Sequence, residues 1–337
     1  MDTINLILKL ENELTNKEIQ EVEKIIERTG YCEIVRILGR NEFDIVLSYP
    51  RYFSETNAFL INNSRECFEV QEDFVKLLKN NSLTCDLKIR VVGVTVPFIY
   101  LMDSKEDIYY YKNIFKILEE VYENKSSTFG SERNVIINKK YGEFIFLDKS
   151  YNREYCQKVI ISSQFESLKS KFSSNTFRNI YDEFPDLRKR MRIEYFLKIS
   201  KSRELGKIMT LTEFQNFNIF ESFTDKAVDY ILENLLNEEK IEKVLEYKID
   251  ELTDKFYEER NRKKLNYENF FYKYINLIVD YRVIRRTLKQ IKNPKTQEGA
   301  ITNMRRLIFR TEEKEKIIIF DTYEKIKNMI SFFKKFK

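Results

Sequence analysis

The sequence predicts an α+β protein in which a mostly antiparallel sheet with flanking helices is followed by an α-helical domain. Runs rich in β-branched and aromatic residues recur in the first two-thirds of the chain and nearly disappear after Thr224. Beyond that point the apolar residues follow the period of a helix. We therefore expect an α+β domain over residues 1–222 and a basic helical domain over residues 223–337, and the chain is long enough for two cores.

The elements of the first domain are predicted from alternating apolar runs and amphipathic stretches between turn residues. Strands are expected at residues 3–9, 31–38, 43–48, 58–61, 87–97, 135–138, 141–147 and 191–199. Helices are expected at residues 16–28, 69–78 and 107–124. Asn16 is predicted to cap the first helix, and Gly30 follows its end. The run LKIRVVGVTVP is the most hydrophobic of the β-type runs, so we expect a central strand there.

The second domain is predicted to contain four helices. They are expected at residues 226–236, 239–259, 267–291 and 317–336. Pro294 and Gly299 are expected to lie in a loop between the last two helices. Just ahead of this domain, Thr210 and Glu213 have the spacing of a capping box, which predicts a helix start.

The chain contains no histidine, and this absence excludes several kinds of site. Ser-His and Cys-His nucleophile pairs, histidine general bases and His-ligated metals are all impossible. Any bound metal must be held by oxygen, which points to magnesium, manganese or calcium. The four cysteines are widely spaced and form no CxxC, so we expect reduced thiols rather than zinc ligands or a disulfide framework.

No apolar run approaches the roughly eighteen residues of a membrane span, and the N-terminus has no signal-peptide pattern. We therefore expect a cytoplasmic protein without a membrane partner.

Charge is segregated along the chain. Residues 1–80 carry 10 basic and 15 acidic side chains, whereas residues 185–210 carry 8 basic and 3 acidic ones. Residues 282–310 carry 9 basic side chains and 1 acidic one. Clustered positive charge of this kind is typical of proteins that bind nucleic acid.

The stretch Pro185–Lys198, PDLRKRMRIEYFLK, combines a basic cluster with an apolar alternation. Met191, Ile193, Tyr195 and Leu197 are predicted to lie on one buried face of a strand. Glu194, the one carboxylate of the opposite face, is either paired with the neighbouring cations or placed where a metal or phosphate is handled.

Several segments together resemble the replication initiation proteins of filamentous phages (gene II-like) and of rolling-circle plasmids (Rep). They are DTINLILK, LKIRVVGVTVPF, GEFIFLDK and PDLRKRMRIEYFLK, followed by MTLTEF. In that family the corresponding segments are a terminal DTI strand, a central RID strand, a strand ending in YDK, and an RIE-x-x-LK strand followed by TL-x-D/E-L. The resemblance covers roughly residues 1–220 and lies in the order and spacing of the segments.

The resemblance implies a Rep-like domain that nicks one strand of origin DNA with the help of an oxygen-bound divalent metal, magnesium or manganese. In that reaction a tyrosine attacks the phosphodiester. Asp148 and Glu194 match the positions of the metal-side carboxylates. Lys149 and Arg192 match the cations that accompany them and would meet phosphate.

The nucleophile has several candidates in this chain. Tyr151 and Tyr155 are spaced i, i+4, which on a helix would place both hydroxyls on one face. Tyr181 and Tyr195 are rivals because they lie close to the basic strand.

Two departures from the family pattern count against nicking. The histidine motif of many rolling-circle nickases is absent, and Gly93-Val94-Thr95 replaces the expected Arg-Ile-Asp. Thr95 thus stands where a carboxylate is expected, and Asp103 or Glu143 would have to substitute for it.

The second half favours an alternative, a sequence-specific DNA-binding or regulatory protein without catalysis. Its candidate contacts are the cations of residues 281–310, together with those of the basic strand. They are Arg188, Arg190, Arg282, Arg285, Arg286, Lys289, Arg305 and Arg306. The expected partners are origin DNA, including its single-stranded form, and host replication proteins. A third interpretation is a helical scaffold whose positive surface meets an acidic protein.

Overall fold

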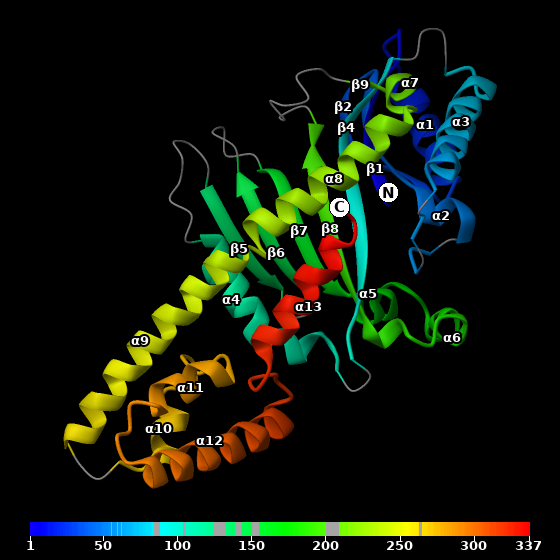
Figure 1. The fold of residues 1–337 in the computed structure, drawn as a ribbon. Coiled ribbons are helices and arrows are strands. Elements are labelled where there is room, and N and C mark those ends of the chain that lie inside the picture. Colours follow the sequence, from blue (N-terminus) through cyan, green and yellow to red (C-terminus); the bar gives the residue numbers. More distant parts are fainter. Residues whose placement is uncertain are drawn as a thin grey trace. The chain divides into compact units, whose positions relative to one another are not determined.

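The computed structural model describes residues 1–54, 56–58, 60–61, 63–83, 88–103, 106–123, 132–138, 143–149, 155–199, 209–262 and 265–337. The chain forms two compact units, whose course can be followed by colour in Figure 1. The first unit comprises residues 1–99 and 127–227, and the second comprises residues 100–126 and 228–337. Residues 100–126 join the second unit because the helix they carry packs against helices from the end of the chain.

A nine-stranded sheet organises the first unit, and the predicted α+β class is confirmed. The strands are β1 (Thr3–Lys9), β2 (Cys32–Gly39), β3 (Glu42–Ser48), β4 (Lys88–Leu101), β5 (Glu132–Asn138), β6 (Glu143–Lys149), β7 (Tyr155–Ser163), β8 (Arg190–Lys198) and β9 (Met209–Thr210). Their order is β2-β3-β1-β4-β8-β7-β6-β5, and β9 pairs with β4. The hydrophobic β4 is therefore central, as its composition predicted.

Several helices of the first unit begin at side-chain caps. The helices of this unit are α1 (Asn16–Glu27), α2 (Tyr49–Ser54), α3 (Ser64–Asn80), α5 (Gln164–Lys171), α6 (Ser174–Glu183), α7 (Leu211–Phe214) and the first part of α8 (Phe217–Asn234). Side-chain caps are present at α1, α3, α5, α6 and α7. Thr15, not Asn16, caps α1, because its extended backbone lets it form a capping box with Glu18. The predicted box at Thr210 and Glu213 is confirmed at α7. The predicted strand at residues 58–61 is wrong, since the described residues of this stretch form no strand.

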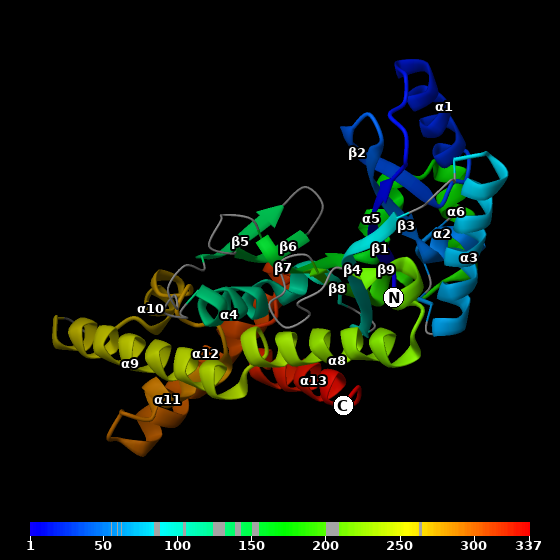
Figure 2. The same ribbon diagram turned by 90° about the horizontal axis from the view of Figure 1, so that it is seen from above.

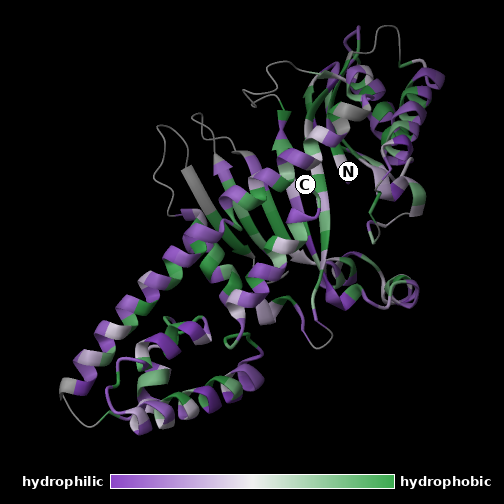
Figure 3. Cartoon of the chain, viewed as in Figure 1, coloured by the Kyte–Doolittle hydropathy of each residue, from purple (hydrophilic) through white to green (hydrophobic). Residues whose placement is uncertain are grey.

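The sheet has one apolar face and one more polar face, and β8 shows both. Met191, Ile193, Tyr195 and Leu197 are at most 2% exposed, which confirms the predicted buried face. Arg192, Glu194, Phe196 and Lys198 alternate with them and lie on the other face. Figure 3 shows the hydrophobic colouring concentrated in the central strands, whereas α9 and α12 alternate between the two colours. Hydrophobic burial on one face leaves the other available for polar groups.

Gly93 lets β4 approach Phe196 closely on the polar face. A Cβ atom at this position would lie 3.0 Å from Cε2 of Phe196 and 3.3 Å from Cβ of Asn5. Such distances are below ordinary van der Waals contact, so any side chain here forces its neighbours to move.

We expect Gly93→Ala to lower the unfolding free energy by about 1–2 kcal/mol through overpacking. Gly39→Ala is the matched control, because nothing lies within 4 Å of a Cβ there. Urea denaturation of both variants measures the difference. Equal stabilities would contradict the close packing of Phe196 on Gly93.

The second unit is helical. It contains the 3₁₀ helix Ile108–Tyr111, α4 (Lys112–Glu123), the end of α8, α9 (Glu238–Arg262), α10 (Tyr267–Lys273), α11 (Tyr281–Leu288), α12 (Pro294–Glu315) and α13 (Thr322–Lys334). α11 packs against both α9 and α12, and Figure 2 gives a second view of these helices. None of the described helices combines the length and apolarity that a membrane crossing requires.

Two predictions for the second unit are wrong. The single helix expected at residues 267–291 is two helices, because Asp280 caps a new helix by accepting from the Arg282 amide. The loop expected around Pro294 and Gly299 is instead the start of α12. Asn293 caps this helix and Pro294 occupies its first turn, where a missing N–H costs nothing.

Candidate functional site

The polar face of the sheet brings Thr3, Thr95 and Glu194 onto neighbouring strands. Thr3 and Thr95 are partners across β1 and β4, and Oγ1 of Thr3 donates to Oγ1 of Thr95 at 2.9 Å. β4 lies beside β8, where Phe196 packs over Gly93. Because Thr95 and Glu194 are each two residues from that contact, both belong to the same face. The structure thus brings together two strand positions that the resemblance had singled out.

A cation also lies on this face. The ammonium of Lys158 on β7 is 5.1 Å from the centre of the Phe196 ring, a cation–π distance. Burial lowers the pKa of Lys158, and the carboxylate of Glu194 partly opposes that effect. The polar face therefore combines hydroxyls, a carboxylate and an ammonium.

Arg192 is held inside the protein by two carboxylates. Its Nη2 lies 2.8 Å from Oδ2 of Asp2, and its Nε lies 2.7 Å from Oε1 of Glu194. Its Nη1 donates to the carbonyl of Asn57 at 2.9 Å, and the residue is 3% exposed. Burial works to lower the pKa of Arg192, but Asp2 and Glu194 outweigh it and raise that pKa.

The prediction that Arg192 meets phosphate is therefore wrong, because its guanidinium is enclosed and already bound. Asp2 was missed as a partner, although it lies directly before the first predicted strand in the DTI segment. Sequence alone could not show that this carboxylate reaches β8.

The predicted metal pair, Asp148 and Glu194, is separated by the register of the sheet. Glu194 on β8 is opposite Ile160 on β7, which is opposite Ile145 on β6. Asp148 lies three residues beyond Ile145, so it projects from the other face of the sheet. These two carboxylates cannot hold one ion. Within the described part of the chain, no group of three or more acidic or thiol side chains is arranged to bind a metal.

The substitutes considered for the missing carboxylate do not complete such a site. Asp103 is bound to Lys325 in the second unit. Glu143 opens β6 on the same face as Glu194, but the strand β7 lies between the two, and neighbouring strands are about 4.8 Å apart. A divalent ion does not fit the ligands that the sequence predicted.

The candidate nucleophiles fall in part outside the described residues. Tyr151 lies outside them, and of Tyr155 and Lys149 only the backbone is described. Tyr155 begins the strand β7, so it does not lie on a helix and the i, i+4 spacing gives no shared helical face. The rival Tyr195 is 2% exposed on the apolar face, where a scissile phosphate has no access. The other rival, Tyr181, packs edge-on against Phe165.

The two remaining arginines of the stretch Pro185–Lys198 differ in their surroundings: Arg188 lies in the 3₁₀ helix Leu187–Lys189, and Arg190 begins β8. Arg190 pairs with Asp186 at 2.8 Å and donates to the carbonyl of Ala58 at 2.6 Å, so it tethers the chain near residue 58. Its predicted role in DNA binding stays a prediction. Arg188 is exposed, and its guanidinium lies 4.8 Å from the centre of the Phe165 ring.

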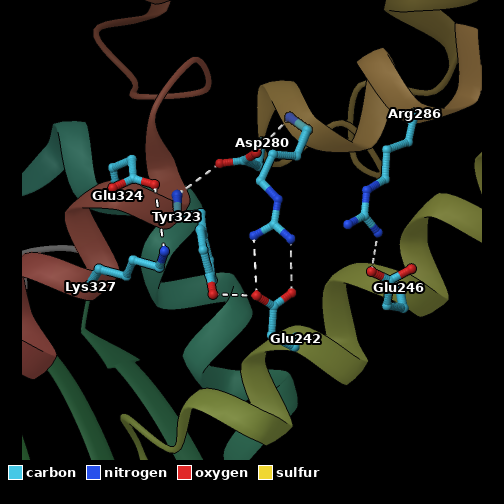
Figure 4. A network of polar contacts seen from close by, with 8 residues as sticks. Glu242, Glu246, Asp280, Arg286, Tyr323, Glu324 and Lys327 are labelled. Carbon is cyan, nitrogen blue, oxygen red and sulfur yellow. Dashed lines mark hydrogen bonds and ion pairs between the residues drawn. The ribbon is translucent and has the colours of Figure 1, made fainter. Parts of the chain in front are cut away.

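In the second unit, α9 presents a column of carboxylates that binds two of the predicted DNA contacts. Arg282 of α11 forms two hydrogen bonds with Glu242, at 2.9 and 3.4 Å, and Arg286 pairs with Glu246 (Figure 4). Burial works to raise the pKa of Glu242, but Arg282 and Tyr323 hold it below its usual range. Arg282 and Arg286 therefore dock α11 on α9, and their predicted contact with DNA stays a prediction.

Asp280 joins the starts of α11 and α13. One carboxylate oxygen accepts from the Arg282 amide at 2.6 Å, and the other accepts from the Tyr323 amide at 2.8 Å (Figure 4). Asp280 is 1% exposed, and burial raises its pKa to about 6 although both amides oppose the shift. This buried carboxyl is a structural joint between two helix ends.

The other predicted cations of α11 and α12 are exposed. Arg285, Lys289, Arg305 and Arg306 have no carboxylate partner within the described residues. Three further exposed cations without such a partner extend this set along the turn and along α12, namely Lys292, Lys295 and Arg310. We call these seven residues the α11–α12 basic surface. The opposite side of α11 is buried and carries apolar residues such as Val283, Ile284 and Leu288.

Comparison with known proteins adds no relative. No family model matches the chain, and neither a curated protein nor a solved structure is significantly similar to it.

Proposed function

We propose that this chain is a DNA-binding replication initiation protein of a phage or plasmid, and that the α11–α12 basic surface contacts the DNA. The observation that carries the proposal is that some cations on and near α11 are paired with carboxylates and others are not. Arg282 and Arg286 are neutralised by α9, whereas the seven residues of the basic surface are exposed and have no carboxylate partner among the described residues. Phosphate is the natural counterion for such a surface.

The arrangement of the two flanks of α11 supports this assignment. A helix that merely needed solubility would carry mixed charges on its exposed side. Here Glu242 and Glu246 of α9 neutralise Arg282 and Arg286, whereas the exposed Arg285 and Lys289 have no carboxylate partner within the described residues. The fold thus presents positive charge on two helices that pack against each other.

The resemblance of residues 1–220 supports initiation as the biological role of the binding. The polar face that carries Thr95 and Glu194 corresponds to the strands from which the resemblance drew its site. Origin DNA and host replication proteins are the partners that this role requires. Nicking is not included, because Asp148 and Glu194 lie on opposite faces.

Salt dependence of DNA binding tests the proposal. Fluorescence anisotropy with labelled origin and unrelated DNA should give affinities that fall steeply as salt rises, because each neutralised phosphate releases counterions. A DNA affinity that does not change with salt concentration, or an equal or stronger affinity for an acidic protein, would favour the scaffold interpretation instead.

We expect Lys289→Gln to weaken DNA binding several-fold at low salt and to reduce the slope of log affinity against log salt by about one. Lys243→Gln is the matched control. Lys243 is also an exposed helical lysine, but it lies among Glu239, Glu242 and Glu246 on α9. An equal loss in both variants would mean that net charge, and not the α11–α12 basic surface, governs binding.

A further inference from the structure

Three aromatic rings form a column at the edge of the α11–α12 basic surface. Phe320, in the connection between α12 and α13, stacks on Tyr281 with ring centres 4.7 Å apart and on Phe309 with ring centres 4.9 Å apart. The ring planes differ by only 25° and 23°. Phe320 is therefore the middle ring, and Phe309 of α12 is a terminal ring that is 46% exposed.

Arg305 lies beside this column and does not cover its end. The guanidinium carbon is 5.1 Å from the centre of Phe320 and 5.6 Å from the centre of Phe309. A group on the outer face of Phe309 would be much farther from Phe320, because the two ring centres are already 4.9 Å apart. Arg305 therefore flanks the stacked rings and leaves the outer face of Phe309 uncovered by its guanidinium.

The adjoining flank of α12 carries a positively charged pocket. Arg306 and Arg310 are one helical turn apart and both line a pocket of about 400 Å³. Asn303 and Tyr267 contribute polar groups to its wall, and Glu268 is the carboxylate among its lining residues. Because Arg306 and Arg310 directly follow Arg305 and Phe309 in sequence, the pocket and the ring column lie on neighbouring flanks of one helix.

We propose that Phe309 stacks on an unpaired base of single-stranded DNA while Arg306 and Arg310 bind the phosphates next to that base. This inference rests on the proposed function and specifies the form of DNA that α12 recognises. Ring faces of bases are buried between neighbours in a duplex, so a flat exposed ring can stack only on a base that has left the duplex. Arginines beside an aromatic platform supply the charge that the backbone needs.

A single tryptophan can report this contact directly, because the chain contains none. Phe309→Trp places an indole at the end of the ring column, and its fluorescence should be quenched when a short single-stranded oligodeoxynucleotide binds. Tyr247→Trp is the matched control, since Tyr247 is 65% exposed beside the carboxylates Glu246 and Asp250. Its emission should remain unchanged.

Affinity measurements separate stacking from charge. Phe309→Leu should weaken single-strand binding roughly 5- to 150-fold, the range for loss of one base–aromatic stack, and leave duplex binding unchanged. Phe309→Tyr should bind as tightly as the native protein. A strand whose bases are replaced by abasic sites keeps its phosphates, so it should bind native protein and Phe309→Leu equally weakly.

The outcomes distinguish this inference from the proposed function. If the native protein binds neither single-stranded nor duplex DNA, both the proposed function and the stacking site are wrong. Salt-dependent DNA binding without quenching at position 309, and without loss in Phe309→Leu, would overturn the stacking site and leave the proposed function standing. Quenching at position 309 alone, together with the selective loss, supports the stacking site.

Discussion

Arg192→Met is expected to lower the unfolding free energy by about 3–5 kcal/mol, the range for removing one partner of a buried ion pair. Arg192 is the charge that balances Asp2 and Glu194, at 2.8 and 2.7 Å. Methionine fills similar space but leaves Asp2, which is 5% exposed, as an uncompensated buried carboxylate. The substitution also removes the hydrogen bond that Arg192 donates to the carbonyl of Asn57. Urea denaturation at neutral pH measures the loss.

Arg286→Met is the matched control for this experiment. Arg286 pairs with Glu246, but the two side chains are 45% and 48% exposed, so the same substitution should cost about 0–1 kcal/mol. A triple variant with Asp2→Asn, Arg192→Met and Glu194→Gln removes the charges together and should recover much of the lost stability. Equal small costs at positions 192 and 286 would contradict the buried ion triad.

Asp280→Asn is expected to abolish a pH dependence of stability between about pH 4 and pH 6. Burial raises the pKa of Asp280 from 3.8 to about 6 in the folded protein. Between these values the folded state holds a proton that the unfolded state has released. The contribution of Asp280 is therefore greatest below the unfolded pKa and is lost as pH rises through 6.

The variant should gain stability relative to native protein by about 2–3 kcal/mol as pH rises from 4 to 7, because asparagine never ionises. The charged neighbours Arg282 and Asp321 also act on the pKa of Asp280, and both are present in the native protein and in the variant. Asp229→Asn is the control, because Asp229 is exposed and pairs with Lys337. Chemical denaturation at several pH values gives the curves, and parallel curves for native protein and Asp280→Asn would contradict the buried carboxyl.

The sheet could be predicted from the sequence largely because its signals are local. Alternation over residues 191–199 placed Tyr195 and Leu197 on the buried face, and the structure confirms it. The capping box of Thr210 and Glu213 also acts over three residues and was predicted correctly. Pro294 was misjudged because proline ends one helix but is equally suited to the first turn of the next.

The candidate sites could be predicted only as lists of residues. Glu194 was correctly placed on a strand and Asp148 directly after one, yet their partnership depends on the register of β6, β7 and β8. Register is set by pairing between distant segments, and a shift of one residue reverses the face on which a side chain lies. Cations posed the same problem, since Arg285 and Arg286 are adjacent in sequence and only Arg286 meets a carboxylate of α9.

By itself, the sequence determined the α+β class, the hydrophobic central strand and the positive charge near the end of the chain, because these properties depend on composition and on periods of a few residues. Only the tertiary structure decided which charges are neutralised and which rings remain uncovered. Asp2 lies 190 positions before Arg192, and Tyr281 lies 39 before Phe320. Contacts at such separations follow from packing, since burial brings together side chains that no local pattern relates.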